Sequence, residues 1–214
     1  MAARRPFAVP HLLQPLALVS SALVVAALAV LLASMVLVPG CARTEPKATA
    51  PTKVPGKVTI SYDLNRISKI ASNQLAVWIE DSKGNYVRTV FATRFMARGG
   101  YKERPQCCPT WIKISGWKDA SAQEIDGVTG ATQRAGRVAV VWDCTDKNGR
   151  PVPRGTYVYR VEGNLFWENR VMAKGEIPVE DKSTTSKAAL EYIPKEARDA
   201  GELFLNVTAE FRPE

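Results

Sequence analysis

Histidine is almost absent from this chain: its 214 residues include one, His11. His11 lies ahead of an apolar stretch near the N-terminus, so the long part of the chain after that stretch has none. Without histidine there is no Ser–His or Cys–His nucleophile system, no His-ligated metal site and no haem attachment through C-x-x-C-H. We therefore expect a protein that is not an enzyme and holds no metal.

Charge is missing from residues 16–38, which are largely apolar. Arg4 and Arg5 precede this stretch, and the sequence Val-Pro-Gly-Cys ends it at Cys41. This order is that of a bacterial export signal with a lipobox, cut and acylated at Cys41. A bilayer needs about 20 apolar residues, so a retained N-terminal membrane helix is the alternative for residues 1–41. Both interpretations place the rest of the chain outside the cytoplasm, at the periplasmic face of a bacterial membrane.

Residues 42–56 have no apolar periodicity and are rich in Pro, Ala, Thr and Lys, which is typical of a flexible tether. Residues 57–214 remain for folding, and this length suits one domain that buries roughly two-thirds of its unfolded surface.

Positive charge is in excess but scattered. The chain has 29 Lys and Arg against 21 Asp and Glu, and the first 41 residues hold two of the arginines and no acid. No long basic run is present, so we expect no nucleic-acid partner and a solvated cationic surface that faces anionic lipid or cell wall.

Cysteine is scarce as well, with three residues besides Cys41: Cys107, Cys108 and Cys144. Thiols tend to pair outside the cytoplasm, and a bridge between adjacent cysteines needs a strained ring. We therefore expect a disulfide from Cys107 or Cys108 to Cys144, with a three-thiolate metal site or small buried cysteines as the alternatives.

The rest of the chain alternates between apolar and polar residues in short runs separated by turn residues, which predicts strands. The expected strands are residues 57–63, 74–80, 86–91, 137–142, 156–162, 171–178 and 203–211. A short helix, broken by Pro194, is expected within residues 187–200. The pattern predicts an all-β fold, an immunoglobulin-like antiparallel β-sandwich of about seven strands with one short peripheral helix.

The loop from Trp142 to Tyr157 resembles a W-D-x-x-D-x-x-G-x-x-V-x-x-G-x-Y pattern in the immunoglobulin-like domain of the flagellar hook-capping protein. The residues of this loop suit tight turns, because Asp146 can accept hydrogen bonds from nearby backbone N–H groups and Gly149 permits a positive φ. The loop also imitates part of an EF-hand. However, Cys144 would take the first ligand position and Gly155 the last, so we expect no calcium site.

Over a longer span, about residues 57–180, four segments resemble the bacterial periplasmic domain-of-unknown-function 2271 family. They are residues 73–81, 84–91, 126–132 and the pair Trp142-Asp143. The resemblance implies an exported β-sandwich without an assigned reaction. The chain departs from the family pattern at Cys107-Cys108 and at Cys144, which favours a local disulfide.

The segment Asp126-Gly-Val-Thr-Gly-Ala-Thr132 is similar to the acceptor motif of covalently flavinylated bacterial redox proteins. The resemblance implies that an exported flavin transferase joins the phosphate of FMN to Thr132. Gly130 and Ala131 would leave room for that enzyme, and Asp126 would assist recognition. Four tryptophans could then shelter the isoalloxazine ring: Trp111, Trp117, Trp142 and Trp167. The alternative is a Gly- and Thr-rich turn that leads into the strand at Arg137, with the tryptophans in the core.

Two functional hypotheses follow. The first is a non-catalytic, membrane-tethered lipoprotein whose immunoglobulin-like domain binds or scaffolds a protein of the cell envelope. The second is a covalent FMN acceptor, modified at Thr132, that acts in extracytoplasmic electron transfer through its cofactor.

Overall fold

The computed structural model describes residues 53–214. The expected export signal or anchor of residues 1–41, its lipidation site Cys41, and most of the expected tether lie outside the described residues. The first strand begins at Gly56. None of the helices within residues 53–214 is long and apolar enough to cross a membrane.

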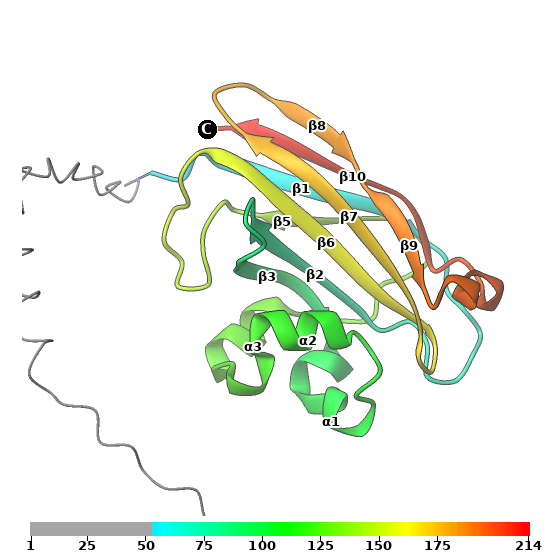
Figure 1. Cartoon of the computed structure of the whole chain (residues 1–214). Coiled ribbons are helices and arrows are strands. Elements are labelled where there is room, and N and C mark those ends of the chain that lie inside the picture. The colour runs from blue at the N-terminus through cyan, green and yellow to red at the C-terminus, as the bar shows by residue number, and fades with distance from the viewer. Residues whose placement is uncertain (1–52) are drawn as a thin grey trace, which may run out of the picture. The chain divides into compact units, whose positions relative to one another are not determined.

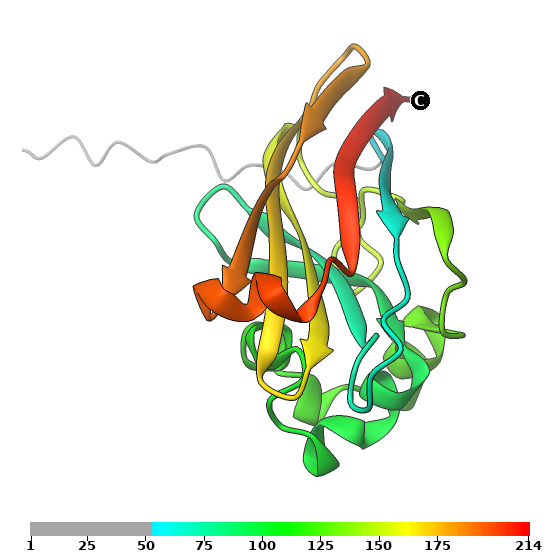
Figure 2. The same ribbon diagram turned by 90° about the vertical axis from the view of Figure 1, so that its right-hand side faces the viewer.

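Two sheets pack face to face as an all-β sandwich (Figures 1 and 2). The four-stranded sheet has the order β5 (Gly136–Trp142), β1 (Gly56–Leu64), β10 (Phe204–Pro213) and β8 (Thr184–Lys187). The six-stranded sheet has the order β4 (Thr129–Gly130), β3 (Tyr86–Thr93), β2 (Leu75–Asp81), β6 (Gly155–Phe166), β7 (Asn169–Val179) and β9 (Ala189–Ile193). All pairs are antiparallel except β3 with β4.

The seven expected strands coincide with β1, β2, β3, β5, β6, β7 and β10. The described chain also forms β4, β8 and β9, so the expected count was too low. Each of these three strands is short and lies at the edge of a sheet. Strands of two, four and five residues are too short to show the alternation by which a sequence reveals a strand.

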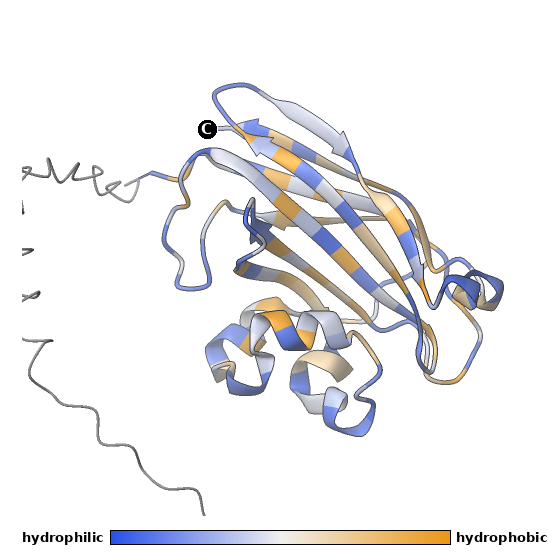
Figure 3. Cartoon of the chain, in the orientation of Figure 1, coloured by the Kyte–Doolittle hydropathy of each residue, from blue (hydrophilic) through white to orange (hydrophobic). Residues whose placement is uncertain are grey.

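The main core lies between the sheets. Alternate residues of β1, namely Val58, Ile60, Tyr62 and Leu64, are buried against apolar residues of β2, β6 and β10. The alternation of hydrophobic and hydrophilic residues along the strands is visible in Figure 3.

A second core lies on the outer face of the six-stranded sheet, under a helical cap of residues 94–128 (Figure 1). The cap contains a π-helical turn (Met96–Gly100), α1 (Tyr101–Glu103), α2 (Pro109–Ser115), a 3₁₀ turn (Trp117–Asp119) and α3 (Ala122–Val128). Trp111 and Trp117 from the cap pack with Trp78 of β2 and Met172 of β7. The sequence pattern did not predict this cap, because its helices are too short to show a helical period.

The cap is fastened to the sheet by a buried carboxylate. Glu162 of β6 accepts hydrogen bonds from the backbone N–H groups of Trp111 (2.9 Å) and Thr110 (3.4 Å) at the start of α2. Arg170 of β7 pairs with the same carboxylate at 2.8 Å.

The prediction of a short helix within residues 187–200 is wrong for the first half of that range. Residues 189–193 form β9, and a 3₁₀ helix (Lys195–Ala200) begins only after Pro194. The apolar residues on which the expectation rested belong to an edge strand, and Pro194 is placed where a helix can begin.

Candidate functional site

The segment that resembles a flavin acceptor spans a helix, a strand and a loop. Asp126 lies in the last turn of α3, and Thr129-Gly130 forms β4, which pairs in parallel with Ala92-Thr93 of β3. The chain then leaves the sheet, and Ala131 and Thr132 are both exposed. The expected acceptor hydroxyl is therefore on an accessible loop.

Two local features fix the path of this segment. Ser121 caps α3 by accepting a hydrogen bond from the backbone N–H of Glu124 at 3.1 Å. A Cβ on Gly130 would lie 2.1 Å from Cε2 of the buried Phe91 ring. Only glycine lets β4 approach β3 this closely, so Gly130 has a packing role in addition to the small size that the motif requires.

The loop that carries Thr132 crosses from one sheet to the other. It connects β4, at the edge of the six-stranded sheet, to β5, at the edge of the four-stranded sheet. The loop is anchored at Gln133, whose Oε1 accepts a hydrogen bond from the hydroxyl of buried Tyr62 at 2.6 Å. Gln133 thus faces the core side while Thr132, its neighbour, is exposed to solvent.

Arginines surround the acceptor segment. Arg98 pairs with Asp126 at 2.7 Å, and both side chains are largely exposed. Arg94 follows Thr93, the partner of Gly130 in β3, and Arg134 follows Gln133; both are exposed. The carboxylate of the motif is therefore engaged by Arg98, and the surroundings of Thr132 are positively charged.

Three of the four tryptophans expected to shelter a flavin are core residues. Trp111, Trp117 and Trp142 are buried, and each indole N–H donates a hydrogen bond: to Thr89 Oγ1, the Ala97 carbonyl and the Thr145 carbonyl respectively. They are not available to a ring attached at Thr132. Trp167, by contrast, is 44% exposed and lies in the turn between β6 and β7.

A polar groove of about 640 Å³ lies next to α3, between β3 and the β5–β6 loop, and includes Arg88, Glu124 and Lys147 in its lining. Gly127 and Val128 of the acceptor-like segment line this groove, but Thr132 does not. Gly130 pairs with Thr93, whereas the groove reaches β3 at Thr89, about 13 Å earlier along the strand.

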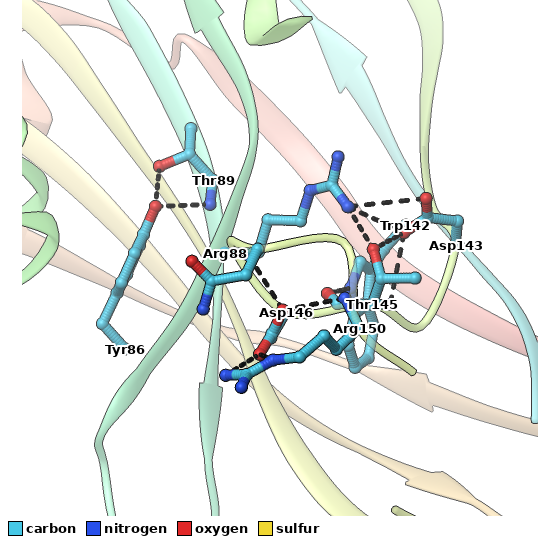
Figure 4. Close-up of polar contacts among 9 residues, drawn as sticks. Tyr86, Arg88, Thr89, Trp142, Asp143, Thr145, Asp146 and Arg150 are labelled. Carbon is cyan, nitrogen blue, oxygen red and sulfur yellow. Dashed lines mark hydrogen bonds and ion pairs between the residues drawn. The ribbon is translucent and has the colours of Figure 1, made fainter. Parts of the chain in front are cut away.

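The β5–β6 loop beside the groove is held by its own side chains and by Arg88 of β3 (Figure 4). Arg88 pairs with Asp143 at 3.2 Å and also donates to Thr145. Asp146 accepts hydrogen bonds from the backbone N–H groups of Asn148 (2.8 Å) and Arg150 (2.9 Å). Although burial alone would raise it, the pKa of Asp146 is lowered, because these N–H groups and the Arg150 guanidinium stabilise the carboxylate.

The sequence matches the DUF2271 family, described as a predicted periplasmic protein, over residues 50–194. The chain belongs to this family. Among solved structures, the DUF2271 domain is similar to truncated FlgD from the human pathogen Helicobacter pylori (strain 26695), with 13% identity, a TM-score of 0.32, and coverage of 75% of this chain and 84% of that one. No curated protein sequence matches.

The cysteines that set this DUF2271 domain apart do not form the expected bridge. Cys107, Cys108 and Cys144 are buried and free. Cys144 belongs to the core between the sheets, whereas Cys107 and Cys108 belong to the core under the cap, so the six-stranded sheet separates them. Burial raises the pKa of Cys144 to about 12.

Several residues that shape this site in the DUF2271 domain were not expected from the sequence. Arg94 and Arg98 come from the end of β3 and the cap, and Tyr62 comes from β1 in the opposite sheet. Arg94 follows the partner of Gly130, Arg98 pairs with Asp126 and Tyr62 bonds Gln133, so the folded chain brings all three to the acceptor-like segment and its loop. No motif in the sequence marks them.

Proposed function

We propose that this protein is an extracytoplasmic electron carrier with FMN joined through its phosphate to Oγ1 of Thr132. A lipid on Cys41, or an N-terminal helix in its place, holds it at the membrane. One observation carries the proposal: the last residue of the acceptor-like segment is exposed on a loop that β4 and the Tyr62–Gln133 hydrogen bond fix in place.

The residues fit attachment through a phosphate. An acceptor hydroxyl must reach a second enzyme's active site, which requires an exposed side chain with small neighbours. Thr132 and Ala131 are exposed, and Gly130 has no side chain. Arg94 and Arg134 supply positive charge for a phosphodiester, which keeps one negative charge. Bound FMN would supply one- and two-electron transfer.

The modification itself needs a transferase and a flavin dinucleotide. The bond between Thr132 Oγ1 and the phosphorus of the FMN half forms, the hydroxyl proton is lost to a base of the transferase, and the phosphoanhydride bond breaks with release of AMP. Asp126 would act as a recognition group for the transferase. Its pairing with Arg98 holds the carboxylate at the end of α3, on the same short segment as the acceptor.

The test is to express the full chain with a bacterial flavin transferase and to measure intact mass and the mass of the peptide that carries Thr132. We expect a gain equal to FMN less one water, and yellow, fluorescent protein. Thr132→Ala should be colourless, and Thr132→Ser should recover flavin because serine keeps a hydroxyl. Thr185→Ala, which removes an exposed hydroxyl from β8, is the matched control and should be flavinylated like the original chain.

The same spectra test the membrane attachment, since peptide mapping also shows whether Cys41 bears a diacylglycerol group. An unmodified Thr132 in a chain that meets an active transferase would contradict the flavin proposal. A lipid-bearing Cys41 in that sample would leave the first hypothesis, an anchored binding or scaffolding module of the envelope.

A further inference from the structure

The loop with Thr132 shares one end of the sandwich with the β1–β2 connection and the β6–β7 turn. Leu64, the last residue of β1, pairs with Gly136, the first of β5, and Leu75 at the start of β2 pairs with Gly163 near the end of β6. Figure 2 looks onto this end, with the β1–β2 connection between the β6–β7 turn and the link from β4 to β5. We call residues 65–74, 94, 131–135 and 167–168 the acceptor end.

The acceptor end exposes two large apolar side chains, Ile70 (75% exposed) and Trp167 (44%). Their loops are tied together. The side chain of Lys69 lies over the Phe166 ring, 5.5 Å from its centre, and this ring is 6.2 Å from that of Trp167. A backbone hydrogen bond of 2.9 Å from Asn164 to Gln74 joins the same two segments. Ile70 and Trp167 therefore stand on a fixed scaffold.

Trp167 is also unusual in its backbone. Its φ is 48°, in the left-handed region that favours glycine or asparagine. Trp167 is only partly buried, so it gains part of the free energy that burial of a tryptophan can supply, and it carries the conformational cost of the left-handed φ. Strained residues of this kind concentrate where a protein binds something.

The charge of the acceptor end is positive close to Thr132. Arg66, Arg94 and Arg134 are exposed, and none takes part in an ion pair among the described residues. The nearby acids are neutralised, because Asp63 pairs with Arg137 and Asp126 with Arg98. Glu168, beside Trp167, is exposed and leaves one negative charge at the edge of this end.

The acceptor end is remote from the start of the domain. β1 has nine residues and runs from Gly56 to this end, a distance of roughly 27 Å. A chain held at a membrane through its N-terminal side could therefore meet a partner here without bringing the partner to the lipid.

We infer that the acceptor end docks an acidic electron-transfer protein, with Ile70 and Trp167 as apolar anchors and Arg66, Arg94 and Arg134 as the charged rim. This inference rests on the proposed function, since it places the partner over the flavin of Thr132. Exposed tryptophan and arginine are the residue types enriched at protein interfaces, and complementary charge speeds encounter. A standard interface buries about 800 Å² on each partner, so the partner would also cover residues around these anchors.

The first experiment measures binding without flavin. The full chain in detergent, with Thr132 unmodified, is titrated with cytochrome b5 as an acidic probe and cytochrome c as a basic one. We expect binding of cytochrome b5 that weakens with salt, and none of cytochrome c. Reversing the three rim arginines to glutamate should weaken cytochrome b5 binding by at least about tenfold.

The matched control changes three exposed lysines at the other end of the sandwich to glutamate: Lys83, Lys147 and Lys182. This variant has the same net charge as the arginine variant and should bind like the original chain. Equal loss in both variants would show a response to net charge alone and overturn the inference.

Trp167→Gly separates docking from folding. Glycine tolerates the left-handed φ, which offsets part of the lost packing on Phe166, so the variant should still unfold cooperatively in urea while it binds cytochrome b5 about tenfold more weakly. Unchanged binding would remove Trp167 from the interface and overturn the inference as stated.

Failure here is distinguishable from failure of the proposed function. A chain that binds the acidic probe at the acceptor end but never carries flavin overturns only the flavin proposal. A chain flavinylated at Thr132 that binds both probes equally overturns only the docking.

Discussion

Gly130 and Gly127 lie in the same acceptor-like segment, but only Gly127 has room for a larger side chain. A Cβ on Gly130 meets Phe91 at 2.1 Å, whereas a Cβ on Gly127, within α3, has nothing within 4 Å. We expect Gly130→Ala to lower the free energy of unfolding by about 1–3 kcal/mol through overpacking. Gly127→Ala should raise it by about 0.5–1 kcal/mol, because alanine favours a helix. Urea unfolding followed by tryptophan fluorescence measures both.

The pair is its own control, since both changes add one methyl group within the same segment. Equal effects of the two substitutions would contradict the close contact of β4 with Phe91. The contrast could not be predicted from the sequence. The motif places both glycines on one turn, and only the pairing of β4 with β3 brings Gly130 against a ring that lies 39 residues earlier.

At the level of elements, the helical cap depends on Glu162. This side chain is fully buried, accepts from the start of α2 and pairs with Arg170. We expect Glu162→Ala to cost about 3–5 kcal/mol, because it leaves a largely buried guanidinium and two backbone N–H groups without their acceptor. Near-UV circular dichroism, which senses the Trp111–Trp117 pair 4.8 Å apart, should lose intensity. Glu210→Gln, at an exposed pair with Arg212, should change stability by less than about 1 kcal/mol.

The pH dependence gives an independent check. Burial raises the pKa of Glu162, with its N–H donors and Arg170 opposing. Protonation therefore favours the folded state. This contribution is complete below the unfolded pKa and is lost as the pH rises through the folded pKa. The difference in stability between the original chain and Glu162→Ala should shrink over that range, and a difference that grows with pH would contradict the assignment.

Some elements can be predicted from their own residues, and others depend on contacts with distant parts of the chain. The sequence predicted seven strands because each alternates or is wholly apolar and is bounded by turn residues. β2 is apolar because the core covers one face and the cap the other. The sequence did not predict the cap. Trp111 and Trp117 pack against the outer face of the six-stranded sheet, and their segments are too short to show a helical period. The sequence marks the acceptor-like segment as a motif, but it does not mark Arg94 and Arg98, because they come from the end of β3 and from the cap.

At the scale of the whole molecule, the two cores are separated by the six-stranded sheet and should open separately. The core between the sheets spans strands of up to 12 residues, whereas the cap consists of helices of seven residues or fewer. Cys107 and Cys108 report on the cap and Cys144 on the core between the sheets. A thiol reacts as its thiolate, and burial raises the pKa of all three thiols, so alkylation requires opening.

We therefore expect pulses of iodoacetamide at increasing urea, read by peptide mass, to label Cys107 and Cys108 at lower urea than Cys144. All three should be labelled in full once the chain is unfolded without reductant, because none is held in a disulfide. A coincident midpoint for all three would make the domain one cooperative unit despite its two cores. Resistance of Cys144 and one cap cysteine to alkylation in the unfolded chain would instead restore the bridge that the sequence led us to expect.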